Sequence, residues 1–102
     1  MKRLARTNLK ESDIKLQIKD YLKYRHIFNY HITQTMGSYP GLPDRVLHYR
    51  GRVIYLEIKR PNGELSIHQQ AFGERCVEDD IAYWVVDSVE KLEALLNKAG
   101  RT

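Results

Sequence analysis

The chain has 102 residues, with 17 Lys and Arg against 13 Asp and Glu, four His and one Cys. This length suits one small domain, and the 42% of apolar residues allow a modest core without covalent staples. A single cysteine excludes an intrachain disulfide framework, and the scattered histidines argue against a Cys/His zinc site.

The distribution of apolar residues predicts one soluble domain. No run of 18 apolar residues occurs, and the basic N-terminus has no apolar segment of the kind that a signal peptide needs. We therefore expect a cytoplasmic protein with one domain over residues 1–102, of which residues 1–7 form a flexible basic tail.

The charge is unevenly distributed along the chain. Residues 1–60 hold 13 basic and five acidic side chains, whereas residues 61–102 hold four basic and eight acidic ones. A basic first half favours a polyanionic partner, with nucleic acid as the leading candidate, although a solvated Lys-rich helix face gives the same composition.

The first half of the chain predicts one helix and three strands. Apolar residues at three- and four-residue steps predict a helix over residues 8–23, begun by an Asn8–Glu11 capping box or by Ser12. Alternating aromatic and β-branched residues predict a strand over 28–35, followed by a Gly- and Pro-rich loop over 36–43. Two further strands, 44–49 and 52–59, are separated by Arg50–Gly51 and predict a hairpin.

The second half predicts a helix, a strand and a last helix. Ser66 and Gln69 form a capping box that begins a helix extending to about residue 78. The apolar run 81–86 predicts a strand buried on both faces, and Ser88 begins a helix that ends near Gly100. The order α-β-β-β-α-β-α predicts an α/β fold with a small mixed sheet, because the fourth strand arrives through a helical crossover.

The hairpin brings acidic side chains together. A turn at Arg50–Gly51 places Asp44 directly opposite Glu57, whereas a turn one residue later places Asp44 opposite Lys59. Opposed residues have Cβ atoms about 4.5–5.5 Å apart, so two carboxylates there repel each other unless a cation lies between them. A hard divalent cation would resolve this conflict. An exposed sheet face with a weak Asp–Lys salt bridge is the alternative.

The order of motifs then points to a family. The chain contains, in sequence, Gly41-x-Pro43-Asp44, Glu57-x-Lys59-Arg60-Pro61 and Ser66-x-x-Gln69. This order resembles the PD-(D/E)xK nucleases, and more narrowly their VRR-NUC branch, over residues 11–86. The resemblance implies a restriction-endonuclease-like core. Gly73 stands four residues after the glutamine, so the Gln-x-x-x-Tyr pattern of some exonuclease relatives is absent.

The resemblance implies metal ligands. Asp44 and Glu57 match the acidic residues that hold Mg²⁺ or Mn²⁺ in such nucleases, with the Ile58 carbonyl as an extra ligand. Glu11 matches the glutamate of the first helix, which shares a metal ion or its waters. From the residues alone, Glu11 can instead be a capping residue, and Asp13 can take its place.

The resemblance also implies two catalytic residues that are not acidic. Lys59 matches the lysine that orients or deprotonates the attacking water, and Gln69 matches the glutamine directed at the site. Gln69 can equally serve only the helix cap, and its neighbour Gln70 is a competitor for the site. No small-molecule cofactor is expected besides the metal ion.

Basic residues near the hairpin are candidate phosphate contacts. We expect Arg60 to be the first of these, and the others to be Arg45, Arg50 and Arg52. The lysines of the first helix, Lys15, Lys19 and Lys23, fit a solvated face. Tyr39, in the Gly- and Pro-rich loop, either meets DNA or packs.

Together these features predict a metal-dependent DNA endonuclease. Cutting both strands with one site per chain requires two copies, so we expect a homodimer. Stand-alone members of the resembled branch are associated with phages and with branched or four-way-junction DNA, which gives the expected substrate. The alternatives are a non-catalytic nucleic-acid-binding module and a restriction-type endonuclease, whose recognition segment is missing here.

Overall fold

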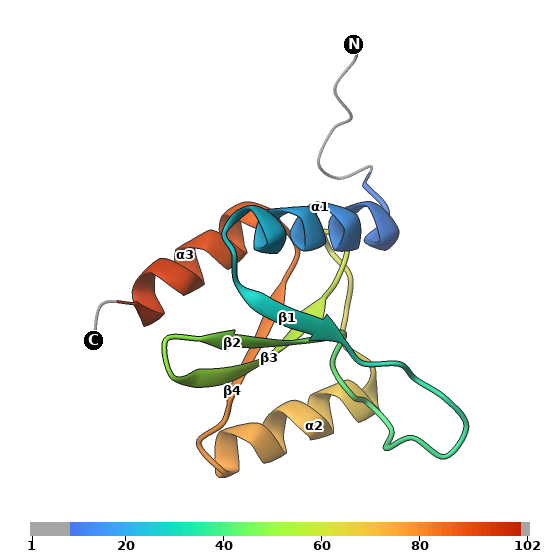
Figure 1. Cartoon of the computed structure of the whole chain (residues 1–102). Coiled ribbons are helices and arrows are strands. Elements are labelled where there is room, and N and C mark those ends of the chain that lie inside the picture. Colours follow the sequence, from blue (N-terminus) through green and yellow to red (C-terminus); the bar gives the residue numbers. More distant parts are fainter. Residues whose placement is uncertain (1–8, 101–102) are drawn as a thin grey trace.

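The computed structural model of the chain describes residues 9–100, so the predicted tail over residues 1–7 and the cap at Asn8 lie outside the described residues. Three helices and four strands follow the predicted order (Figure 1). They are α1 (Glu11–Tyr24), β1 (Phe28–His31), β2 (Arg45–Tyr49), β3 (Arg52–Ile58), α2 (Ile67–Glu78), β4 (Ala82–Val86) and α3 (Val89–Ala99). The α/β prediction is confirmed, while the restriction-endonuclease-like core stays a prediction.

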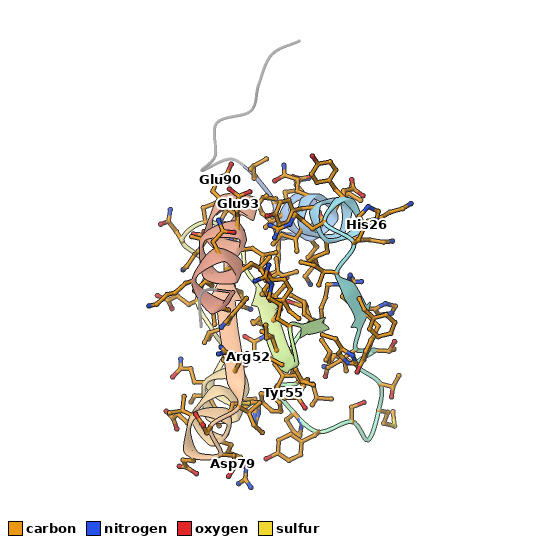
Figure 2. The ribbon with its side chains drawn as sticks, turned by 60° about the vertical axis from the view of Figure 1, so that its left-hand side comes forward. His26, Arg52, Tyr55, Asp79, Glu90 and Glu93 are labelled. Carbon is orange, nitrogen blue, oxygen red and sulfur yellow. The ribbon has the colours of Figure 1, made fainter. Side chains whose placement is uncertain are left out.

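The strands form one mixed sheet in the order β1-β2-β3-β4. The β1–β2 and β2–β3 pairs are antiparallel. The β3–β4 pair is parallel, because α2 carries the chain back to the end of the sheet at which β3 begins. α1 and α3 lie on one side of the sheet and α2 on the other (Figure 1). In Figure 2, Asp79 at the end of α2 lies across the molecule from Glu90 and Glu93 of α3.

The core lies between the sheet and the helix pair α1–α3. Its fully buried side chains come from both helices and from alternate positions of the strands, among them Ile14, Ile18, Leu22, Leu47, Ile54, Leu56, Ile58, Leu92 and Leu96. Leu56 and Ile58 therefore face α1, and Glu57 between them faces the opposite side, toward α2. Within residues 9–100 no helix is long and apolar enough to cross a membrane.

The start of the first helix was predicted wrongly. Residues 9 and 10 are not helical, and α1 begins at Glu11 after the N-cap residue Lys10. The Lys10 amide donates a hydrogen bond to Asp13 Oδ2 at 2.9 Å, so Asp13 is the acidic residue that caps this helix. This cap leaves the Glu11 side chain available for other contacts.

Two strand predictions also need correction. β1 ends at His31 and not at residue 35, because its partner β2 begins at Arg45, which pairs with His31. One further hydrogen bond, from the Ile32 amide to the Asp44 carbonyl, closes the ladder at 2.9 Å. β4 is only half buried over most of its length and not buried on both faces, because it is an edge strand of the sheet.

The hairpin turn has the predicted position. Arg50 and Gly51 both have positive φ, 50° and 80°, which is the requirement of a two-residue type I′ turn. Tyr49 pairs with Arg52 and Arg45 pairs with Leu56, so the register places Asp44 beside Glu57 and not beside Lys59. The first of the two predicted registers is confirmed.

Candidate active site

Asp44 and Glu57 lie together where β2 begins and β3 ends. Asp44 immediately precedes β2, and its Oδ2 accepts a hydrogen bond of 2.7 Å from the Ile58 amide. This bond fixes the Asp44 carboxylate across the end of β3. The Ile58 residue, predicted to offer its carbonyl to a metal ion, thus contacts the site through its amide.

Glu57 is a buried carboxylate with an incomplete set of partners. Its side chain is 2% exposed, and its Oε2 has no hydrogen-bond partner. Burial, together with hydrogen bonding to Asp44 and the negative charge of Asp44, raises the pKa of Glu57 from 4.5 to about 8. The nearby ammonium groups of Lys59 and Lys15 act in the opposite direction and do not cancel this effect. A bound cation would therefore stabilise the ionised form of Glu57.

Gln69 serves the helix cap and the site at once. The backbone amide of Ser66 donates to Gln69 Oε1 at 2.9 Å, and the backbone amide of Gln69 donates to Ser66 Oγ at 3.2 Å. These two bonds confirm the capping box. The remaining group, Gln69 Nε2, donates to Glu57 Oε1 at 3.2 Å. Gln70 instead donates to the Leu65 carbonyl, so Gln69 is the glutamine that contacts the acidic pair.

Glu11 is linked to the acidic pair by ion pairs with two lysines. Its Oε2 is 3.1 Å from Lys15 Nζ, and its Oε1 is 3.9 Å from Lys59 Nζ. The Lys59 side chain is 16% exposed, which is low for a lysine and places its charge close to the end of β3. Four parts of the chain therefore meet at the candidate active site. They are α1, the segment before β2, the end of β3 and the start of α2.

Lys15 is the site residue that sequence reasoning missed. Its ammonium bridges Glu11 and Asp44, with an Nζ–Oδ1 distance of 3.1 Å to Asp44. These two carboxylates raise the pKa of Lys15 against the opposing effect of desolvation. The signal was present in the sequence, because Lys15 lies one helical turn after Glu11 and must share its face of α1.

Gly41 holds the preceding loop against α2. Its φ is +83°, and a Cβ added there would come 2.2 Å from the His68 carbonyl oxygen. Only glycine allows this approach, which brings the loop to the first turn of α2 three residues before Asp44. The same loop carries Tyr39, whose ring lies 6.5 Å from the Phe72 ring of α2. Tyr39 is nevertheless 57% exposed, so this contact covers only part of it.

The four predicted phosphate contacts divide into two groups. Arg60 is exposed and directly follows Lys59, so it lies at the site end of the sheet. Arg45 is also at that end, but its Nε donates to Asn29 Oδ1 at 2.9 Å, and burial lowers its pKa. Arg50 lies in the hairpin turn and Arg52 directly follows it, at the opposite end of β2 and β3 from Asp44. These two arginines are not part of the cluster.

The donor set fits a divalent cation only in part. Within residues 9–100, no three His, Cys, Asp or Glu side chains stand close enough together to hold a metal ion. Two carboxylates do lie together, and the unpartnered Glu57 Oε2 is a suitable hard donor. Mg²⁺ commonly uses one or two carboxylates and keeps several waters, so Asp44 and Glu57 suffice for such an ion.

Comparison with known proteins adds nothing to this geometry. No family model, no curated protein and no solved structure matches the chain. The resemblance to VRR-NUC nucleases therefore stays a prediction from the sequence motifs.

Proposed function

We propose that this protein is a divalent-metal-dependent DNA endonuclease of the PD-(D/E)xK type, belonging to the VRR-NUC branch. The observation that carries the proposal is the buried Glu57 carboxylate, which lies beside Asp44 with one oxygen unpartnered. A buried carboxylate with a pKa this far from its ordinary value is costly to the fold, and such costs concentrate at functional sites.

Each neighbouring side chain has a role in phosphodiester hydrolysis. Gln69 fixes the orientation of Glu57 through its Nε2 hydrogen bond. Lys59 places a positive charge beside the acidic groups, where it can orient the attacking water and offset charge on the phosphate. Glu11 holds Lys59 and Lys15 in place. Asp44 and Glu57 would hold a divalent cation, which would supply an activated water and offset charge on the phosphoryl oxygens.

The exposed basic residue at this end of the sheet suits a phosphate backbone. Arg60 directly follows Lys59 and is exposed. One site cuts one strand, so the proposed enzyme acts as a homodimer on branched or four-way-junction DNA.

A cleavage assay tests this function. Purified protein is incubated with labelled duplex, flap, single-stranded and four-way-junction DNA, in Mg²⁺, Mn²⁺ or EDTA. We expect cutting that needs the metal and that is abolished in Asp44→Asn, which keeps the shape of the side chain. Cutting that persists in EDTA or in this variant would contradict the mechanism.

A non-catalytic nucleic-acid-binding module is the second candidate. One observation favours it: the Lys15 ammonium contacts both Asp44 and Glu11 at 3.1 Å and so offsets part of their negative charge. The same assay separates the two functions, because a binding module retains the DNA in every buffer and cuts none of the substrates.

A further inference from the structure

Three aromatic rings lie together on one face of β1 and β2. Phe28 and Tyr30 come from β1, and His48 pairs with Phe28 across the ladder. The ring centroids of Phe28 and His48 are 4.9 Å apart, those of Tyr30 and His48 are 5.8 Å apart, and those of Phe28 and Tyr30 are 5.9 Å apart. Phe28 is 63% exposed and Tyr30 is 45% exposed, so the cluster is a surface and not part of the core.

No helix in the described part of the chain covers this aromatic cluster. Leu47 belongs to the core beneath α1 and α3, so its neighbour His48 faces the other side of the sheet. On that side α2 packs against β4, which is at the far edge of the sheet from β1. In both figures α2 lies away from β1. Contiguous exposed aromatic side chains of this kind mark binding surfaces.

The aromatic cluster and the candidate active site lie on the same face of the sheet, with the buried Val46 between His48 and Asp44. Side chains two apart on a strand share a face, so His48, Val46 and Asp44 follow one another along the same side of the sheet. Four residues of strand span about 13 Å, which corresponds to roughly four phosphates of a stacked strand. A strand whose backbone reaches Asp44 can therefore place its neighbouring bases over the three rings.

The charge on this part of the sheet suits a phosphate backbone. β1 and β2 carry no acidic side chain, and Lys59 and Arg60 place positive charge at the end of the sheet where Asp44 lies. A polyanion that reaches Asp44 would meet these two positive charges.

We propose that Phe28, Tyr30 and His48 form a stacking platform for the unpaired bases of a single-stranded segment beside the cleavage site. Proteins hold single strands by combining positive charge for the backbone with aromatic rings for the bases, and every base offers a π-face. The platform thus selects substrates that have single-stranded arms, without reading their sequence. This assignment depends on the proposed nuclease only for its place relative to the cut.

Binding without cleavage tests the platform. Fluorescence anisotropy in EDTA gives the affinity of the full chain for a labelled single strand and for a blunt duplex of the same length. Phe28→Leu and Tyr30→Leu keep an apolar side chain but remove the ring. We expect each to weaken single-strand binding about tenfold and to leave duplex binding unchanged. Phe28→Tyr, which keeps a ring, should bind as the wild type does.

Tyr24→Leu is the matched control, because this ring is 77% exposed at the end of α1, which covers the other side of the sheet. It should bind the single strand normally. Wild-type affinity in both Leu variants would overturn the proposal. So would sedimentation showing that these variants turn a dimer into a monomer while single-strand affinity stays the same, since the rings would then bind a second copy.

Failure of the platform differs from failure of the proposed nuclease. If the wild type cuts no substrate and Asp44→Asn still binds the single strand, the proposed nuclease is wrong and the proposed platform stands. If Phe28→Leu cuts DNA in a metal-dependent way and binds the single strand with unchanged affinity, only the proposed platform is wrong. Thermal unfolding of each variant shows that it is folded, which the surface position of both rings favours.

Discussion

The Lys15 ammonium nitrogen lies 3.1 Å from Asp44 Oδ1, the carboxylate oxygen that the Ile58 amide does not occupy. α1 therefore places a positive charge against the carboxylate that we propose as a metal ligand. The same ammonium contacts Glu11 at 3.1 Å. Lys15 acts as a counter-ion of the metal-free site, and a divalent cation at Asp44 would compete with it.

Removal of this charge should change metal binding in a definite direction. In Lys15→Met the metal-free protein loses two partly exposed ion pairs, and we expect its free energy of unfolding to fall by about 1 kcal/mol. Mn²⁺ should bind several-fold more tightly, because no ammonium competes for Asp44. Isothermal titration calorimetry and denaturant unfolding give the two quantities.

Lys19→Met is the control for this experiment, because Lys19 lies one turn later on α1 and is exposed. It removes the same charge from the chain without removing a contact to Asp44. Equal Mn²⁺ affinity in the two variants would mean that Lys15 does not compete with the metal ion.

The pKa of Glu57 makes stability depend on pH. The pKa is about 8 in the folded chain, against an ordinary value of 4.5. Between these values the folded state keeps a proton that the unfolded state has released, so the free energy of unfolding falls as pH rises from about 4.5 to about 8. The loss amounts to roughly 1.4 kcal/mol for each unit of pKa difference. Denaturant unfolding at a series of pH values measures it.

Glu57→Gln should flatten this dependence, since its amide carries no proton that titrates in this range. Metal binding requires the ionised carboxylate, so Mn²⁺ affinity of the wild type should rise with pH over the same window. A wild-type stability that is constant between pH 5 and pH 8 would contradict the raised pKa.

Local sequence patterns were sufficient for the order of the elements. The Ser66 and Ser88 caps, the Arg50–Gly51 turn and the apolar periodicity each depend on neighbouring residues, and each predicted its element correctly. The start of α1 was wrong because the helix is capped at Lys10 by Asp13, whereas the end of β1 was wrong because it depends on strand pairing. β1 ends where its partner strand begins, which is a tertiary fact that no local pattern contains.

The acidic pair was predictable because hairpin register is set by the turn. Once Arg50 and Gly51 form the turn, the position of Asp44 beside Glu57 follows from strand geometry. The role of Lys15 was less accessible, since it depends on where α1 lies over the sheet. The choice between Glu11 and Asp13 needed the same information, and the structure places Asp13 at the cap and Glu11 at the lysines.

Gln69 should contribute through both of its contacts. Gln69→Leu removes the hydrogen bond to Glu57 and one half of the capping box, so we expect a loss of about 2 kcal/mol in the free energy of unfolding. Ser66→Ala removes only the serine half of the box and should cost about 1 kcal/mol. Glu57 loses a partner in the first variant only, so only Gln69→Leu should alter Mn²⁺ affinity. A similar change in Mn²⁺ affinity in Gln69→Leu and Ser66→Ala would mean that Gln69 acts only in the helix cap.

Gly41 should be the glycine on which the position of Asp44 depends. In Gly41→Ala the new Cβ would lie 2.2 Å from the His68 carbonyl oxygen, at a φ of +83°. We expect a loss of more than about 2 kcal/mol in the free energy of unfolding, because the left-handed strain adds to a clash with backbone. The loop must move away from α2 and carry Asp44 with it, so Mn²⁺ affinity should also fall. Gly37→Ala is the matched control, since its φ is +90° and nothing lies within 4 Å of the added carbon. It carries the strain without the clash, and unchanged Mn²⁺ affinity in Gly41→Ala would show that the loop does not position Asp44.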